Sequence, residues 1–134
     1  VRTVPVGTAE ELCAAMLAES AGADVVVMSA AVADFRPATV SPAKLKKDSA
    51  GEPDSVPLVR NPDVLAELVT KRTEGQLVVG FAAETGDADG DVLTHARAKL
   101  ARKGCDLRVV NDVSGGRVFG AEDNAVVVLG ADGS

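Results

Sequence analysis

Aromatic side chains are nearly absent from this chain of 134 residues, which contains three Phe and neither Trp nor Tyr. Aromatic residues commonly anchor protein-binding surfaces and stack on the bases of single-stranded nucleic acids. The net charge of −6 also argues against a general nucleic-acid binder, whose affinity comes from clustered Lys and Arg. The sequence therefore predicts no nucleic-acid partner, and any anion site must be local.

Cysteine is also scarce, and no long apolar run is present. Cys13 and Cys105 belong to no CxxC pair and have no nearby His, so they predict buried, reduced thiols rather than a metal site or a disulfide. No apolar run approaches the ~20 residues of a membrane-spanning helix, and no secretory leader is recognisable. We expect a cytoplasmic protein without a membrane partner. Because Val1 is not a start methionine, we also expect the chain to be part of a longer polypeptide.

Two common nucleotide-binding fingerprints are missing as well. The chain has no GxxxxGK[ST] phosphate loop and no G-x-G-x-x-G after a strand. A nucleotide site, if there is one, must be built from other elements.

What is present is an alternation of helical and strand-like segments in a chain that is 46% apolar. Valine-rich runs without polar alternation, such as residues 24–28, are typical of strands buried on both faces of a parallel sheet. The expected helices span 9–20, 61 onward and 92–104, and the expected strands are 1–6, 24–28, 56–59, 77–81, 107–110 and 124–129. This order predicts one Rossmann-like α/β domain of three layers, with a mostly parallel sheet and helices on both faces.

The residues that follow the strands are the first candidates for a site, because ligands of such sheets bind beyond the carboxyl ends of the strands. Small residues follow Met28 and would let a ligand approach the backbone closely. Asp34, in the same stretch, could hold a divalent cation or a ribose hydroxyl. It could equally pair with Arg36 or cap a turn.

Positive groups for an anion are also available. Asn61-Pro62-Asp63 predicts a helix start with Asn61 as N-cap, and a helix N-terminus attracts anions. Lys99 and Lys103 are four residues apart, so they repel unless an anion lies between them, although they could simply complement the helix dipole.

Two further features have equally open interpretations. The lysines at 44, 46 and 47 lie in a long loop and either close over a phosphate or form a solvated surface. Phe81 either packs on a base or belongs to the core.

Several blocks together resemble the phosphopantothenoylcysteine synthetase family, the CTP-dependent phosphopantothenate–cysteine ligases of coenzyme A biosynthesis. In bacteria this domain is usually the C-terminal half of a bifunctional protein whose N-terminal half is a flavin-dependent decarboxylase. The blocks run nearly end to end: AAVADFRP at 30–37, KLKK at 44–47, NPD at 61–63, VGFAAET at 79–85 and NDV at 111–113.

The resemblance implies that the carboxylate of 4′-phosphopantothenate attacks the α-phosphate of CTP, which gives an acyl-cytidylate and pyrophosphate. The amine of cysteine then displaces CMP. Mg²⁺ is expected to assist the first step, and FMN belongs only to the decarboxylase half of the parent protein.

The resemblance also implies roles for individual residues. Asp34 and Lys44 are expected to be catalytic, with Asp34 also holding the metal. The expected CTP contacts are Met28, Ser29, Ala30, Asp34, Lys44, Pro62, Asp63, Val64, Leu65, Phe81, Lys99 and Lys103.

In the family, a Gly-rich segment and an Asn that holds the acyl-cytidylate lie upstream of the first residue here. We therefore expect the chain to bind CTP without completing the ligation. The family also implies a homodimer, with 111–122 and the segment near Val56 as candidate contacts. A nicotinamide-dependent reductase and a non-catalytic nucleotide-binding module are the alternative interpretations.

Overall fold

The computed structural model describes residues 1–43, 55–84, 92–112 and 126–132. The order of elements is α1 (Ala9–Ser20), β1 (Val25–Met28), β2 (Phe35–Pro37), β3 (Leu58–Arg60), α2 (Val64–Lys71), β4 (Leu77–Glu84), α3 (Val92–Lys103), β5 (Leu107–Asp112) and β6 (Val126–Gly130). Among these residues no helix has both the length and the apolar character needed to cross a membrane.

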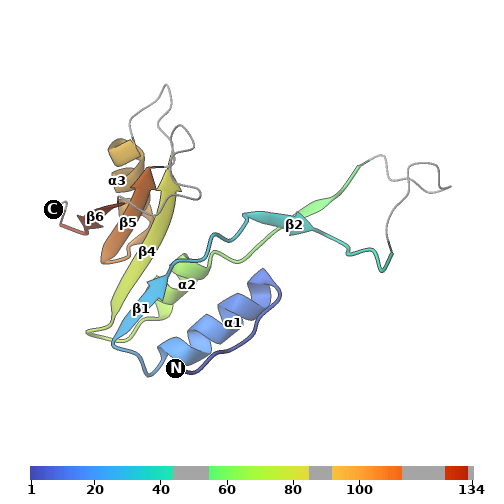
Figure 1. Cartoon of the computed structure of the whole chain (residues 1–134), viewed down its shortest axis with the longest axis horizontal. Coiled ribbons are helices and arrows are strands. Elements are labelled where there is room, and N and C mark those ends of the chain that lie inside the picture. Colours follow the sequence, from blue (N-terminus) through green and yellow to red (C-terminus); the bar gives the residue numbers. More distant parts are fainter. Residues whose placement is uncertain (44–54, 85–91, 113–125, 133–134) are drawn as a thin grey trace.

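The main sheet has the strand order β1-β4-β5-β6 (Figure 1). β1 pairs in parallel with β4, with Met28 opposite Gly80, and β4 pairs in parallel with β5, with Ala82 opposite Val110. Only β6 is antiparallel to its neighbour β5. The predicted α/β fold with a mostly parallel sheet is confirmed.

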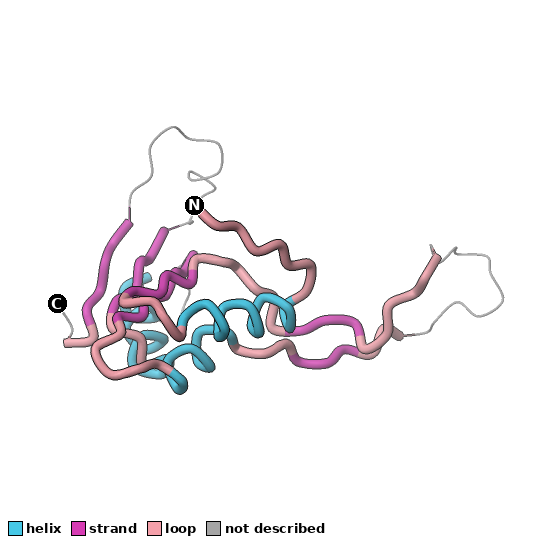
Figure 2. The backbone as a smooth tube through the Cα atoms, turned by 90° about the horizontal axis from the view of Figure 1, so that it is seen from below, coloured by secondary structure: helices cyan, strands magenta, loops and turns pink. Residues whose placement is uncertain are grey.

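One face of this sheet carries the core. Val26 of β1, Val78 of β4 and Val110 of β5 point to the same face and are at most 5% exposed. They form a single cluster with buried residues of all three helices, including Cys13 and Leu68. Figure 2 shows the helices together on one side of the strands. Cys13 and Cys105 are buried free thiols, as predicted.

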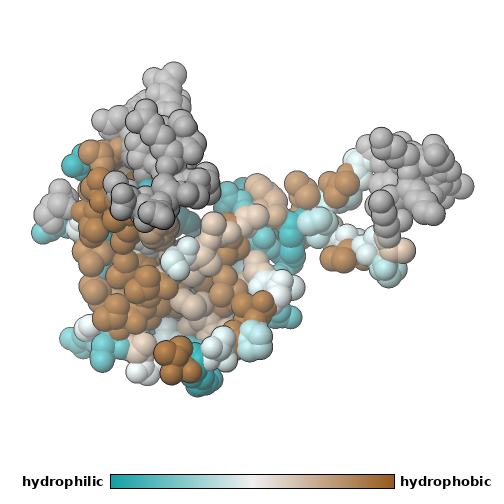
Figure 3. Space-filling view, viewed as in Figure 1, coloured by the Kyte–Doolittle hydropathy of each residue, from teal (hydrophilic) through white to brown (hydrophobic). Residues whose placement is uncertain are grey.

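The other face of the sheet is open within the described part of the chain. Val25 and Val27 are 51% and 57% exposed, and Val126 and Val128 of β6 are also exposed. Figure 3 shows this apolar surface over the strands. The prediction that 24–28 is buried on both faces is wrong here. The helices among the described residues pack on one face of the sheet. A valine run records that both faces are apolar, but it does not record what covers them.

A two-stranded arm extends away from the sheet (Figure 1). It consists of β2 and β3, paired antiparallel with Phe35 opposite Arg60. The predicted strand near 56–59 is thus found at Leu58–Arg60, whereas its partner was not predicted, because a three-residue strand that ends in Pro37 has almost no periodicity. The strand expected at 1–6 does not form, and this segment is exposed.

The helix starts follow local capping rules, with one shift. Thr8 and Glu11 form the predicted capping box of α1, in which Thr8 Oγ1 accepts from the Glu11 amide at 3.1 Å. The N-cap of α2 is Asp63, not Asn61 as predicted. The Asn61 side chain instead contacts Ala33, in the loop after β1, and Arg36 of β2, so Asp63 is the residue that caps the helix.

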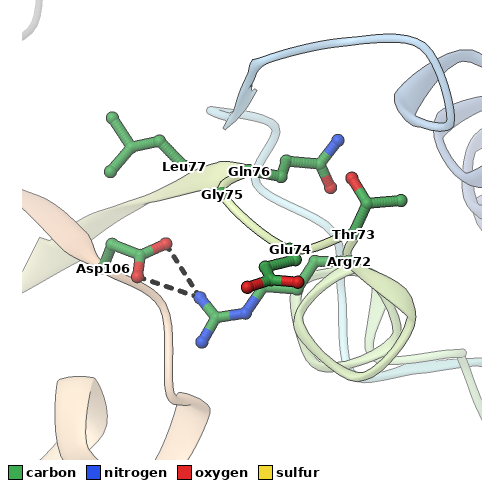
Figure 4. Close-up of a pocket in the computed structure, with 7 residues that line it drawn as sticks. All are labelled: Arg72, Thr73, Glu74, Gly75, Gln76, Leu77 and Asp106. Carbon is green, nitrogen blue, oxygen red and sulfur yellow. Dashed lines mark hydrogen bonds and ion pairs between the residues drawn. The ribbon is translucent and has the colours of Figure 1, made fainter.

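The opposite end of the sheet, where β4 and β5 begin, is closed by polar contacts. A pocket of about 370 Å³ there is lined by residues 72–77 and Asp106 (Figure 4). Arg72 Nη1 donates to both carboxylate oxygens of Asp106 at 2.9 Å, and Asp106 Oδ2 accepts from the Val78 amide at 2.8 Å. Gln76 donates to the carbonyls of Ser20 and Ala23, which fixes the end of α1. The polar groups of this pocket are hydrogen-bonded to one another, so we interpret the pocket as part of the packing of the sheet and not as a ligand site.

We expect Asp106→Asn to lower the free energy of unfolding by about 1 kcal/mol, as one partly exposed charged contact does. The hydrogen bond from Val78 and the charge of Arg72 hold the pKa of Asp106 below its ordinary value, despite the opposing effect of burial. A lowered pKa contributes stability that is full above about pH 4 and is lost as pH falls through the folded pKa. Urea unfolding measured between pH 3 and pH 7 should therefore show that the free energy of unfolding falls less at acid pH in the variant than in the unchanged chain. Glu74→Gln is the control, because Glu74 is an exposed residue of the same pocket. If Asp106→Asn loses as much unfolding free energy at acid pH as the unchanged chain, Asp106 is not the source of the pH dependence.

Candidate functional site

The main cavity lies at the carboxyl ends of β1 and β4. Its volume is about 780 Å³, and it is lined by the end of β1, residues 30–35, the start of α2, residues 81–83 and the last turns of α3. A cavity of this size suits a small molecule of nucleotide dimensions. It lies beyond the carboxyl ends of parallel strands, where ligands of such sheets bind.

The structure brings most of the predicted site residues together at this cavity. Those that line it are Met28, Ala30, Asp34, Pro62, Asp63, Val64, Leu65, Phe81, Lys99 and Lys103. Ser29 is exposed beside them but does not line the cavity. Lys44 lies outside the described residues. The shared location is a structural finding, whereas the role of each residue stays a prediction.

The cavity is cationic although the chain is acidic. Its cationic side chains are Arg60, Lys99, Arg102, Lys103 and Arg108, against two carboxylates, Asp34 and Asp63. The net charge of the whole chain is −6. This local excess of positive charge is the property expected of an anion site.

Asp63 links the start of α2 to the end of α3. Its Oδ1 accepts from the Ala66 amide at 3.2 Å, and its Oδ2 accepts from Lys103 Nζ. Burial raises the pKa of Asp63, but the hydrogen bonds from Lys103 and Ala66 and the charges of Lys103 and Arg102 outweigh this effect. The pKa is therefore lowered, and the carboxylate stays ionised at neutral pH.

Asn61 and Arg36 hold the loop after β1 against the base of the arm. Asn61 Nδ2 donates to the Ala33 carbonyl at 2.8 Å, and the Asn61 amide donates to the Asp34 carbonyl at 2.9 Å. Arg36 Nη1 donates to Asn61 Oδ1 at 3.0 Å, and Arg36 also pairs with Glu10 of α1. The alternative in which Asp34 pairs with Arg36 is not observed, since Arg36 pairs with a different acid.

None of the cavity's three arginines, Arg60, Arg102 and Arg108, was among the predicted site residues. Arg108 is only 6% exposed, and its Nε and Nη1 atoms are buried without a hydrogen bond, although the side chain has other interactions. The available signal was an arginine inside the apolar run Leu107–Val110, because a charge is rarely buried without a purpose. The sequence gives no such signal for Arg60, because its position at the cavity depends on the pairing of β2 with β3.

Phe81 does not end its strand as predicted, because β4 continues to Glu84. Phe81 is 38% exposed and is among the residues that line the cavity, so it is not a core residue. It lies two residues after Val79, which pairs with Val27, so its side chain belongs to the open face of the sheet. Arg60 and Phe35 form a cation–π contact at the base of the arm, 5.5 Å from guanidinium to ring centre. The exposure of Phe81 agrees with the prediction that it packs on a base, and this role stays a prediction.

The carboxylate of Asp34 fits the predicted metal in chemical type. Mg²⁺ takes oxygen ligands, keeps several waters and is often held by one or two carboxylates together with substrate phosphates. No group of three or more His, Cys, Asp or Glu side chains gathers for a metal within the described residues. A single carboxylate at an anion cavity therefore suits a metal that arrives with a phosphate-bearing ligand.

The fold and the cavity define a protein of the Rossmann-like α/β type with a cationic small-molecule site at the carboxyl edge of its sheet. Residues 1–134 match the family model "DNA/pantothenate metabolism flavoprotein C-terminal domain". The chain therefore belongs to this family.

Curated relatives agree with this assignment. A coenzyme A biosynthesis bifunctional protein CoaBC from Mycolicibacterium smegmatis is 56% identical over the whole of this chain, and one from Vibrio parahaemolyticus is 37% identical over 99% of it. The chain spans about a third (33%) of the length of each of these relatives.

Solved structures show the same fold. The crystal structure of the C-terminal domain of a CoaBC protein superposes with a TM-score of 0.71 at 30% identity, covering 100% of this chain and 54% of that one. A flavoprotein of DNA/pantothenate metabolism from Streptococcus pneumoniae, at 19% identity, supports the fold alone, with a TM-score of 0.67 over 95% of this chain and 59% of that one. The predicted Rossmann-like class is confirmed.

We expect Asn61→Ala to loosen the loop after β1, because it removes the donor to Ala33 and the acceptor for Arg36. The free energy of unfolding should fall by about 1–2 kcal/mol, and the protection factors of the amides of residues 61 and 38, which donate to the carbonyls of Asp34 and Pro57, should fall. Hydrogen exchange measured by NMR tests this, with Thr70→Ala, which removes an exposed hydrogen bond within α2, as the control. Unchanged protection of these two amides would show that the Asn61 side chain does not hold the loop.

Proposed function

We propose that this chain is the CTP-binding part of a phosphopantothenate–cysteine ligase of coenzyme A biosynthesis that acts in the cytoplasm. The observation that carries the proposal is the convergence, at one cavity, of the end of β1, the start of α2 and the cationic end of α3. Membership of the family and the names of its curated relatives support coenzyme A biosynthesis as the pathway.

The proposed reaction has two steps. The carboxylate of 4′-phosphopantothenate attacks the α-phosphate of CTP and pyrophosphate leaves, which gives an acyl-cytidylate. The amine of cysteine then attacks the acyl carbon, CMP leaves and the amine gives up a proton. FMN is assigned to the decarboxylase part of the parent protein and not to this chain.

The residues of the cavity suit the first of these steps. Negative charge moves onto the leaving pyrophosphate as the α-phosphate is attacked, so cations and helix amides placed there stabilise the transition state. We assign the phosphates to Lys99, Lys103 and the start of α2. Mg²⁺ held by Asp34 and the phosphates would supply further neutralisation.

The base is assigned to the part of the cavity at the end of β1. Backbone groups of residues 28–30 offer donors and acceptors at fixed positions, because Met28 is held in the register of the sheet. Discrimination among bases requires such fixed polar groups. Phe81 is exposed at the same cavity and is assigned to pack against the nucleoside.

Titration of the purified chain with CTP, ATP and NAD, each with and without Mg²⁺, tests the proposal. We expect selective CTP binding that Mg²⁺ strengthens, and a loss of about tenfold in affinity in Lys99→Met, as for one charged contact. Lys71→Met is the matched control, because Lys71 pairs with Glu67 on α2 away from the cavity. Preferential NAD binding would favour the reductase, and no nucleotide binding would favour a non-catalytic module.

We also propose that the chain forms a homodimer through its arm. Val56 and Leu58 are 61% and 59% exposed, in the segment predicted for this contact. The other predicted segment, 111–122, lies mostly outside the described residues. Sedimentation velocity over a range of concentrations should show a dimer for the chain and a monomer for Leu58→Glu. A dimer that persists unchanged in this variant would exclude the arm as the contact.

A further inference from the structure

Asp63 uses its two oxygens for two different tasks. Oδ1 caps α2 by accepting from the Ala66 amide, and Oδ2 accepts from Lys103, the last residue of α3. The Lys103 side chain is 21% exposed and that of Asp63 is 49% exposed, so the pair is only partly shielded from water. A partly exposed ion pair of this kind contributes little net stability and is open to exchange.

The carboxylate stands where a phosphate would be expected to bind. A helix N-terminus and a neighbouring lysine are the two groups that together recognise phosphate, and both are engaged by Asp63. Lys99 and Arg102 line the same cavity beside this pair. A phosphate that enters therefore competes with this internal anion for the Ala66 amide and for Lys103.

We propose that Asp63 is a built-in counter-ion, which a phosphate of the nucleotide displaces so that Lys103 exchanges the carboxylate for the phosphate. This inference rests on the proposed nucleotide site. In the empty protein the carboxylate neutralises Lys103 and offsets its repulsion from Arg102. In the complex the same carboxylate repels the phosphate. Asp63 therefore sets the affinity for the charged part of the ligand and leaves the nucleoside part unaffected.

The lowered pKa of Asp63 supports this role, because the carboxylate remains charged at neutral pH and competes continuously. Neutralising it should strengthen phosphate binding. Asn is the suitable replacement, since Asn is as good an N-cap as Asp and retains the acceptor for Ala66. Asp63→Asn thus removes the charge and keeps the helix start.

Calorimetric titration with CTP and cytidine tests the proposal in four variants: Asp63→Asn, Lys103→Met, the double variant and Glu67→Gln. We expect Asp63→Asn to tighten CTP binding about three- to tenfold and to leave cytidine unchanged. The gain should be smaller in the Lys103→Met background, because the competition for Lys103 is then absent and only the repulsion between the carboxylate and the phosphate remains. Glu67→Gln removes one lysine-paired negative charge from the same helix, away from the cavity, and should give no gain.

Each other result overturns the counter-ion role. Weaker CTP binding by Asp63→Asn would mean that Asp63 positions Lys103 or a metal for the ligand. An equal gain in Glu67→Gln, or an undiminished gain without Lys103, would reduce the effect to general charge. Inorganic tripolyphosphate separates this test from that of the proposed function. If CTP binds no better than ATP, the ligase proposal fails, whereas Asp63→Asn must still tighten tripolyphosphate for the counter-ion role to hold.

Discussion

Parallel hydrogen bonding between β1 and β4 joins two segments that are far apart in the chain, and the cavity depends on this pairing. Met28 lies opposite Gly80, so the loop after β1 and the last residues of β4 emerge at the same edge of the sheet. The Leu65 side chain of α2 packs against the backbone of Gly80. A Cβ at position 80 would lie only 2.8 Å from Leu65 Cδ2, which is too close for any side chain. Glycine at this position therefore lets the start of α2 approach the strand ends closely enough to share a cavity with them.

Local chemistry allowed much of this arrangement to be predicted from the sequence. The Thr8–Glu11 capping box, the valine runs and the position of Gly104 after α3 are short-range signals, and the corresponding elements are present. The rule that ligands bind at the carboxyl ends of parallel strands then indicated the correct edge of the sheet. Asp34 follows a strand that ends at this edge, whereas Lys103 was expected at the same site only from the family resemblance, and both line the cavity.

The failures have a common physical cause, which is that long-range contacts override local preference. Asn61 is a good N-cap by type, but Ala33 and Arg36 engage its side chain, so Asp63 caps the helix. Phe35–Pro37 becomes a strand only because Leu58–Arg60 lies beside it. Arg108 reaches the cavity from within an apolar strand: alternation places it on the same face as Val110, but it cannot show that this face borders the cavity.

The contrast between the acidic chain and its cationic cavity affects events that precede binding. The net charge of −6 repels an anionic molecule from the chain as a whole, whereas the cationic side chains of the cavity attract it nearby, since the field extends roughly 8–10 Å at physiological ionic strength. The charge distribution therefore favours encounters with anions at this cavity before any hydrogen bond forms.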